Sequence, residues 1–147
     1  MRFGKELYIV IERTFDHDAV EHAMKSYVDK IVGFHPHVWL TDESNVALTD
    51  GRNYSLFERE LPHVVTGHYF FLDRGKEAIS IAKEMLREAF NGDYNIDIIR
   101  GLTPLENLGA RWMSKHIGFT SYGVVQTMLG PCELVILTKK EWEEQNG

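Results

Sequence analysis

The sequence predicts a mixed α/β domain in which helices flank a central sheet. Its 147 residues, 44% of them hydrophobic, are enough for one core and too few for two, so we expect a single domain over residues 1–147. Short apolar runs alternate with longer segments of helical periodicity. A strand, a tight turn and a helix follow one another near the middle of the chain. The expected order of elements is β-α-β-β-β-α-β-α-β-β.

The first two expected elements are a strand and a helix. Side chains in residues 5–13 alternate between two faces, which indicates a strand. A helix follows over residues 16–33, where Asp18 and Glu21 have the spacing of a capping box and Gly33 marks the end.

Strands dominate the middle of the chain. The Asp50-Gly51 turn predicts a hairpin, and residues 64–72, apolar at almost every position, indicate a central strand buried on both faces. A strongly periodic helix over residues 75–90 comes directly afterwards. The remaining expected elements are extended runs at 37–40, 45–48 and 53–60, strands at 95–101, 121–129 and 133–138, a helix at 103–117 with Gly118 as its C-cap, and a polar tail at 139–147 anchored by Trp142.

The turn between the central strand and its helix has the layout of an anion site. Asp73-Arg74-Gly75-Lys76 joins the two elements directly. A helix that begins straight after a strand directs its unpaired N–H groups and its positive dipole end at the turn, where they attract an anion. Many helices begin in this way and bind nothing, so the turn alone leaves both interpretations open.

Composition and charge exclude several classes of function. The net charge is −6 and the Lys and Arg residues are scattered, so we expect no binding to nucleic acid. No apolar run is long enough for a signal peptide or a membrane span, and the single cysteine, Cys132, excludes an internal disulfide framework. We therefore expect a soluble, cytoplasmic protein with no membrane partner.

A second motif gives the turn a family context. Asn107, Ala110, Gly118 and Phe119 are spaced 0, +3, +11 and +12. This spacing resembles the last conserved segment of the GNAT superfamily of acetyl-CoA-dependent N-acetyltransferases, and the upstream strand, turn and helix resemble the cofactor segment of that family. The resemblance covers residues 5–138. It implies a mixed, mostly antiparallel central sheet and the transfer of an acetyl group from acetyl-CoA to an unknown acceptor amine.

The resemblance also implies which residues would hold the cofactor. Backbone N–H groups of the turn would bind the pyrophosphate of coenzyme A, the end of the central strand would bind the pantetheine arm and the acetyl carbonyl, and an asparagine would bind the arm. The implied residues are Arg74, Gly75, Lys76, Glu77 and Ala78 in the turn, Phe71 and Leu72 in the strand, and Asn107, which can also serve as a helix N-cap.

Two departures from the family pattern bear on activity. The Arg74-Gly75-Lys76 turn leads directly into the helix without two of the glycines that the family's loop carries, and Glu77 places a negative charge beside the expected pyrophosphate. Ser114 stands where many relatives have a tyrosine that protonates the leaving thiolate, and serine is a poor acid. These departures imply that binding of acetyl-CoA or coenzyme A is weak or lost.

The shortened turn, the residues at 101–104 and the small acidic chain resemble a phage-encoded branch of GNAT-like proteins. Some members of that branch are described as head-assembly proteins of short-tailed phages. This resemblance implies a second hypothesis: a catalytically degenerate module for protein interaction in virion head assembly. Its partners would be phage or host proteins in the cytoplasm of a bacterial host.

Several side chains could supply the base and the acid of an acetyl transfer. His68 and His63 have an intrinsic pKa suited to deprotonating an amine, although a histidine packed in a sheet is the commoner case. Glu58 and Glu60 are rival bases. Tyr122 could replace the missing acid, but we interpret it as an ordinary strand tyrosine.

His35 and His37 have the spacing of metal ligands. No third ligand accompanies them in the sequence, so we expect no metal site. Folding is likewise expected to need no metal.

Overall fold

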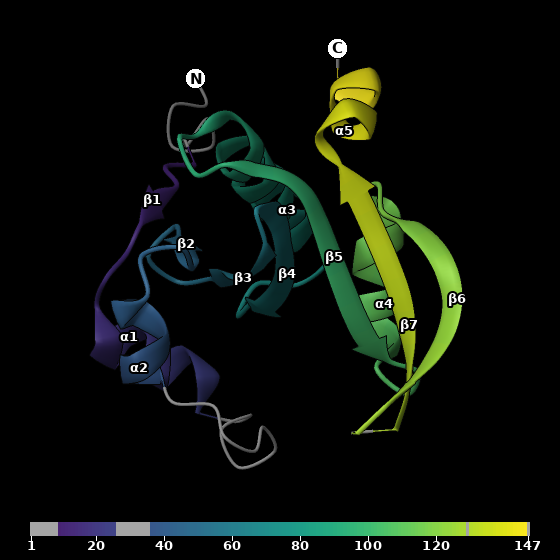
Figure 1. The fold of residues 1–147 in the computed structure, drawn as a ribbon, viewed down its shortest axis with the longest axis horizontal. Coiled ribbons are helices and arrows are strands. Elements are labelled where there is room, and N and C mark those ends of the chain that lie inside the picture. Colours follow the sequence, from purple (N-terminus) through teal and green to yellow (C-terminus); the bar gives the residue numbers. More distant parts are fainter. Residues whose placement is uncertain (1–8, 26–35, 129, 147) are drawn as a thin grey trace, which may run out of the picture.

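The computed structural model of the chain describes residues 9–25, 36–128 and 130–146, which form a seven-stranded sheet with helices on both faces (Figure 1). The elements in chain order are β1 (Glu12–Arg13), α1 (His17–Met24), α2 (Pro36–Thr41), β2 (Val46–Thr49), β3 (Tyr54–Leu61), β4 (His63–Phe70), α3 (Gly75–Asn91), β5 (Ile96–Pro104), α4 (Leu108–His116), β6 (Thr120–Thr127), β7 (Gly130–Thr138) and α5 (Lys139–Asn146).

The order of the strands across the sheet is β1-β2-β3-β4-β5-β7-β6. β4 and β5 are parallel, and every other neighbouring pair of these strands is antiparallel. The parallel pair is joined by α3, the crossover helix that such a pair requires. The prediction of a mixed, mostly antiparallel sheet flanked by helices is therefore confirmed.

Alternation along the strands separates two hydrophobic clusters on opposite faces of the sheet. On one face α3 buries Leu86 against Phe57. On the other face α1 and α2 bury Met24 and Trp39 against Leu56. Because Leu56 and Phe57 are adjacent in a strand, their side chains must point to opposite faces. The sheet is thus covered by α3 on one side and by α1 and α2 on the other.

The first strand is shorter than the sequence predicts. Of the expected strand at 5–13, residues 1–8 lie outside the described residues, and residues 9–11 are not in a strand. Among residues 9–13, only Glu12 and Arg13 pair with β2. The period-2 pattern is present in residues 9–11, but a strand also needs a neighbour to pair with.

The first helix is capped two residues earlier than the capping-box spacing indicates. Asp16 is the N-cap of α1, and its Oδ1 accepts the Ala19 N–H at 3.1 Å. Asp18 lies in the first turn instead. Residues 26–33 of the expected helix, including its stop at Gly33, lie outside the described residues.

The prediction of an extended run at 37–40 is wrong, because these residues belong to α2. Pro36 is the first residue of this helix, and the fixed φ of proline suits that position. Trp39 and Leu40 are adjacent to each other and both buried in the cluster with α1. Tertiary packing therefore overrides the β propensity of the sequence His37-Val38-Trp39-Leu40.

Of the polar tail expected at 139–147, residues 139–146 form α5 instead, and residue 147 lies outside the described residues. Thr138 and Glu141 make a reciprocal capping box: the Thr138 N–H donates to Glu141 Oε1 and the Glu141 N–H donates to Thr138 Oγ1, each at 3.1 Å. Trp142 is buried, which confirms it as the anchor. None of the described helices is long and apolar enough to cross a membrane.

The helix expected at 103–117 begins later, at Leu108. β5 continues to Pro104 because it pairs with β7 as far as Cys132. Asn107 then caps α4, with its Oδ1 accepting the Ala110 N–H at 3.1 Å. This contact confirms the N-cap role expected for Asn107.

Candidate functional site

β4 and β5 are paired at one end and separate at the other. Their parallel register ends at the pair formed by Thr66 and Arg100. Beyond this pair β4 stays with β3 as far as Phe70, and β5 stays with β7 as far as Pro104. The sheet is therefore split between its two parallel strands, and Figure 1 shows β5 running away from β4 toward α4. We call this split the β4–β5 opening.

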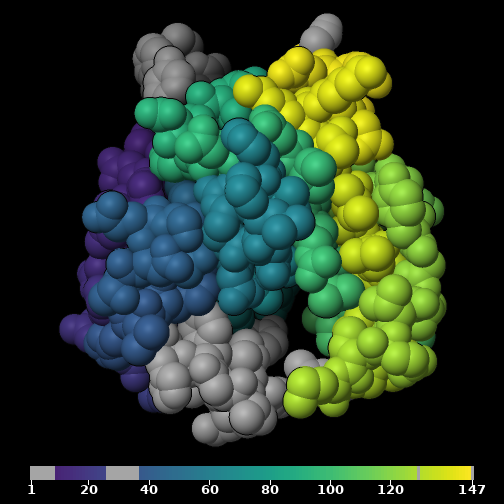
Figure 2. Space-filling view, in the orientation of Figure 1, coloured from purple at the N-terminus to yellow at the C-terminus, as the bar shows by residue number. Residues whose placement is uncertain are grey.

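Two helices begin at the mouth of the β4–β5 opening. The carboxyl ends of parallel strands lie at the same edge of a sheet, and α3 follows β4 while α4 follows β5. Both helices therefore direct their N-termini toward this edge. Figure 2 shows the surface hollowed between the blue-green residues of the β3–β4 hairpin and the green residues of β5. In α/β sheets, ligands bind at such carboxyl edges, where the chain turns away in two directions.

α3 begins without a side-chain cap. Its N-cap, Arg74, makes no capping hydrogen bond, and the Arg74 guanidinium donates through Nη1 to the Phe71 carbonyl at 3.3 Å. The N-termini of α1 and α4, by contrast, are capped by Asp16 and Asn107. Gly75 has a φ of 61°, in the left-handed region that favours glycine, so the chain turns abruptly into the helix. In the described part of the chain, the first N–H groups of α3 thus have no side-chain cap.

The other turn residues differ in what they can offer a ligand. Lys76 and Glu77 are exposed, so both charges face solvent beside the uncapped N–H groups. Ala78, in the first turn of α3, has a fully buried side chain, so this residue could offer a ligand only its backbone N–H group.

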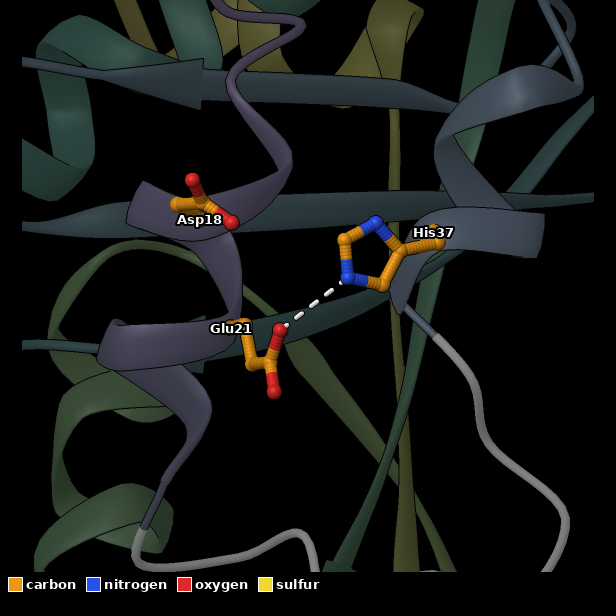
Figure 3. A group of neighbouring side chains, drawn as sticks. All are labelled: Asp18, Glu21 and His37. Atoms are coloured by element: carbon orange, nitrogen blue, oxygen red, sulfur yellow. Dashed lines mark hydrogen bonds and ion pairs between the residues drawn. The ribbon is translucent and has the colours of Figure 1, made fainter.

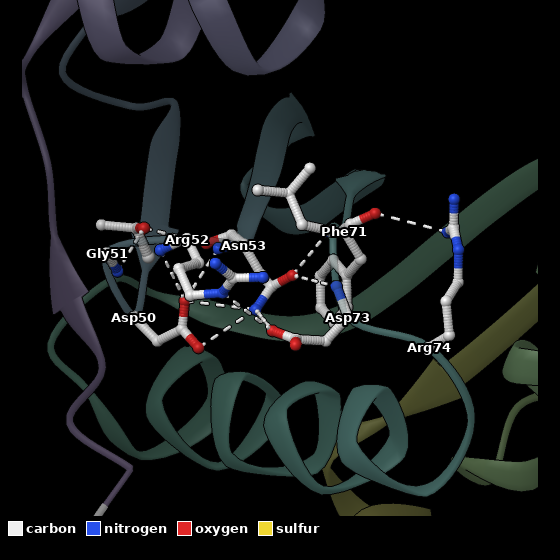
Figure 4. A network of polar contacts seen from close by, with 9 residues as sticks. Asp50, Gly51, Arg52, Asn53, Phe71, Asp73 and Arg74 are labelled. Carbon is white, nitrogen blue, oxygen red and sulfur yellow. Dashed lines mark hydrogen bonds and ion pairs between the residues drawn. The ribbon is translucent and has the colours of Figure 1, made fainter.

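Asn53, in the turn between β2 and β3, fixes the chain that leads into α3. It is fully buried, and its Oδ1 accepts the N–H groups of Leu72 at 2.7 Å and Asp73 at 3.1 Å. Its Nδ2 donates to the carboxylates of Asp73 at 2.7 Å and Asp50 at 3.1 Å (Figure 4). The Leu72 N–H, which was expected to face a cofactor, is therefore already used within the protein.

The carboxylate of Asp73 is held away from the α3 N-terminus by polar partners. The hydrogen bond from Asn53 lowers the pKa of Asp73, partial burial opposes this, and the Arg52 guanidinium, whose Nε lies 3.4 Å away, lowers it further. Asp73 is thus ionised and paired at neutral pH. Glu77 remains the exposed acidic group of the turn.

Of the candidate bases, His68 and Glu58 lie together beside the β4–β5 opening. His68 Nε2 is 3.2 Å from Glu58 Oε1, and the two side chains are 37% and 40% exposed, so solvent reaches both. The hydrogen bond from His68 lowers the pKa of Glu58, and the charge of Arg100 contributes less. An ionised Glu58 favours the tautomer in which Nε2 carries the proton, and Nδ1 of a neutral His68 is then the proton acceptor.

A polar row crosses the closed end of the β4–β5 opening. Thr66 Oγ1 accepts a hydrogen bond from Arg100 Nε at 2.9 Å and donates to Glu60 Oε1 at 2.9 Å. Thr66 and His68 alternate with Val65, which faces α3, so they lie on the sheet face covered by α1 and α2. His68, Glu58 and this polar row therefore border the β4–β5 opening on the face covered by α1 and α2, and not on the face covered by α3.

Tyr69 lies on the opposite face, in the separated part of β4. Its ring folds back over Gly67, where a Cβ would overlap the Tyr69 hydroxyl, so a larger residue would require the ring to shift. The hydroxyl is buried and has no hydrogen-bond partner among the described residues. Burial raises the pKa of Tyr69, so the phenol is a protonated donor without an acceptor.

The remaining sequence-predicted site residues lie in different places. His63 is at the closed end of β4, where its Nδ1 is 3.1 Å from Asp97 Oδ2. Tyr122 is on β6, which β7 separates from β5, and its side chain is exposed. Ser114 lies in the last turn of α4 and is partly buried. The Asn107 carboxamide caps α4 at the mouth of the opening.

Four residues that shape the site have weak signals or none in the sequence. Arg100 and Asn53 act through contacts with distant segments, and nothing in the local sequence distinguishes them. Tyr69 and Gly67 form an i, i+2 pair in a strand, which places them on one face and could have suggested that the ring covers the glycine.

No family model and no curated protein sequence matches the chain. Solved structures with a similar fold include the aminoglycoside acetyltransferase AAC(6')-Ib in complex with coenzyme A, at a TM-score of 0.69 and 16% identity over 94% of this chain and 99% of that chain. The same enzyme in complex with ribostamycin and coenzyme A gives a TM-score of 0.67 and 18% identity over 94% and 97% of the two chains. A mutant of the spermidine N-acetyltransferase SpeG from Vibrio cholerae gives a TM-score of 0.72 and 9% identity over 94% of this chain and 99% of that chain. At these identities the likeness shows the fold, and the chain has the GNAT fold.

Proposed function

We propose that the chain is an acetyl-CoA-dependent N-acetyltransferase with a weakened cofactor site. The β4–β5 opening carries this proposal, because an uncapped helix N-terminus borders it on one side and the His68–Glu58 pair borders it on the other. Helix N-termini favour phosphate, and separated strands leave backbone groups free for an amide-containing arm. The named activities of the structural neighbours agree with it.

The residues at the opening fit coenzyme A in part. The N–H groups that follow Arg74, together with the Arg74 and Lys76 charges, suit a diphosphate. The unsatisfied Tyr69 hydroxyl is buried, so it could donate to a carbonyl or another acceptor along β4 only after its ring turns away from Gly67. Glu77 opposes an anion at the same place, so we expect the affinity to be low.

Acetyl-CoA, when bound, supplies the acetyl group as a thioester that an amine can attack. His68 Nδ1 would accept the proton of the acceptor amine. The new amide bond would replace the carbon–sulfur bond of the thioester, and coenzyme A would leave as a thiolate that takes a proton from solvent. Glu58 would orient the imidazole and stabilise its protonated form. The acceptor would enter from the sheet face that carries these two side chains, opposite α3.

A thiol-release assay tests this function. Spermidine, kanamycin and ribostamycin serve as acceptors, with saturating acetyl-CoA. We expect turnover with at least one amine, a decrease of about 100-fold or more in kcat for His68→Ala, and no comparable decrease for the control His63→Ala, which lies at the closed end. Absence of turnover with any amine, or equal effects of the two substitutions, would contradict the proposal.

The alternative is that the fold serves as a degenerate module for protein interaction, such as a phage head-assembly protein. The observations that favour it are the short turn with Glu77 and the positions of Ser114 and Tyr122, because a serine replaces the expected acid and the tyrosine lies on the far edge of the sheet. Such a module has no need of coenzyme A. Complete absence of coenzyme A binding would therefore select this alternative.

A further inference from the structure

Two helices on one face of the sheet bring a histidine and two carboxylates together. Asp18 and Glu21 are three residues apart on α1, so they share a face of that helix. His37 is on α2, and its Nε2 is 3.1 Å from Glu21 Oε2. One ligand atom from each of the three residues lies within 4.8 Å of the others (Figure 3). The sequence could not show this group, because α1 and α2 are separate segments of the chain.

The second nitrogen of His37 has its own partner. His37 Nδ1 is 3.0 Å from Nδ1 of His17, which lies on α1. When His37 Nδ1 carries the proton and donates it to His17, the lone pair of His37 Nε2 points toward the carboxylates. A hydrogen bond of this kind to the far nitrogen is how proteins fix the tautomer of a metal-binding histidine.

The backbone that carries these groups is held in place by the core, while the groups themselves are open to solvent. Val20 and Met24 on α1 and Trp39 on α2 are buried in one cluster. His37 and Glu21 are 59% and 54% exposed. The ligand positions are therefore preorganised by packing and still accessible to an ion.

We propose that Asp18, Glu21 and His37 form a three-ligand site for a divalent transition-metal cation of the zinc type, with His17 orienting His37. Imidazole together with carboxylates suits zinc and its neighbours in the first transition row, whereas magnesium and calcium prefer oxygen ligands alone. Ligand atoms around tetrahedral zinc are about 3.4 Å apart, so small rotations of these exposed side chains complete the geometry. The cation would join α1 to α2, and this proposal does not depend on acetyl transfer.

Calorimetric titration of the full chain with zinc ions, and the melting temperature with and without zinc, test the site. We expect one saturable site and a higher melting temperature with zinc. His37→Ala and Glu21→Gln should each weaken binding by about tenfold or more, whereas the control His22→Ala, an exposed histidine on the same helix, should leave it unchanged. Circular dichroism of the variants checks that each one folds.

Three results would overturn the proposal. The first is the absence of saturable zinc binding to the wild-type chain. The second is zinc binding that His37→Ala and Glu21→Gln leave intact, and the third is magnesium binding of equal affinity. The last two results would indicate general attraction to acidic groups.

Discussion

Asn53 connects two turns that lie 20 residues apart in the chain. It is fully buried, and its carboxamide hydrogen-bonds to the backbone of Leu72 and Asp73 and to the carboxylates of Asp50 and Asp73. Removal of one side chain therefore leaves several half-buried polar groups short of a hydrogen bond. Each such group carries the cost of its lost solvation.

Asn53→Ala is expected to lower the free energy of unfolding by about 2–4 kcal/mol, because half-buried N–H and carboxylate groups each lose a hydrogen bond. Urea denaturation measures the change. Asn91→Ala, at the exposed end of α3, is the matched control and should change stability little. Equal effects of the two substitutions would show that the Asn53 network does not hold the turn.

Tyr69→Phe separates a structural role of the hydroxyl from a ligand-binding role. The hydroxyl has no partner among the described residues, so its removal should leave the stability of the free protein unchanged or raise it by up to about 1 kcal/mol. Affinity for acetyl-CoA should fall at the same time. A clear loss of stability without ligand would mean that the hydroxyl is already satisfied in the free protein.

Glu58→Gln gives a stability difference that depends on pH. His68 lowers the pKa of Glu58 in the folded state, so the ionised carboxylate stabilises the fold above the ordinary glutamate range. That contribution is lost as the pH falls through the lowered pKa. The variant should therefore be less stable than wild type at neutral pH, and the gap should close in acid. A gap that stays constant or widens in acid argues against the His68–Glu58 pair.

At the scale of elements, α3 and α5 show where sequence patterns succeed and fail. α3 is predicted almost to the residue, because its apolar stripe is a local signal. α5 is missed because its composition is polar, although its Thr138–Glu141 capping box is visible in the sequence. The helix also depends on tertiary packing of Trp142 against Phe90, with ring centroids 5.6 Å apart. No local pattern reveals that partner.

Trp142→Ala is expected to lower the free energy of unfolding by about 3–5 kcal/mol, because it leaves a cavity beside Phe90 and detaches α5 from the core. The exposed Trp112, on α4, supplies the control: Trp112→Ala should cost much less. Urea denaturation of both variants makes the comparison. A small effect of Trp142→Ala would show that α5 is not anchored by its tryptophan.

At the scale of the whole molecule, the fold gathers helix N-termini and a polar row around one split in the sheet. Apart from α2 and α5, the sequence predicts the order of the elements, and it predicts the strand-turn-helix layout before α3, because both depend on neighbours in the chain. It does not predict where β4 and β5 stop pairing. That point is set by the competing partners β3 and β7, whose contacts link residues far apart in sequence. The side of the opening on which His68 lies follows only from this arrangement.

The central claim is that the turn before α3 still binds the diphosphate of coenzyme A, but weakly. Calorimetric titration with coenzyme A tests it on the wild type, on Glu77→Gly and on Glu77→Gln, which removes the charge and keeps the length of the side chain. We predict one site with a dissociation constant on the order of tens of micromolar, tightened about tenfold by either substitution because a like charge beside the anion is removed. Sub-micromolar binding that neither substitution changes, or no binding by any of the three proteins, would contradict the claim.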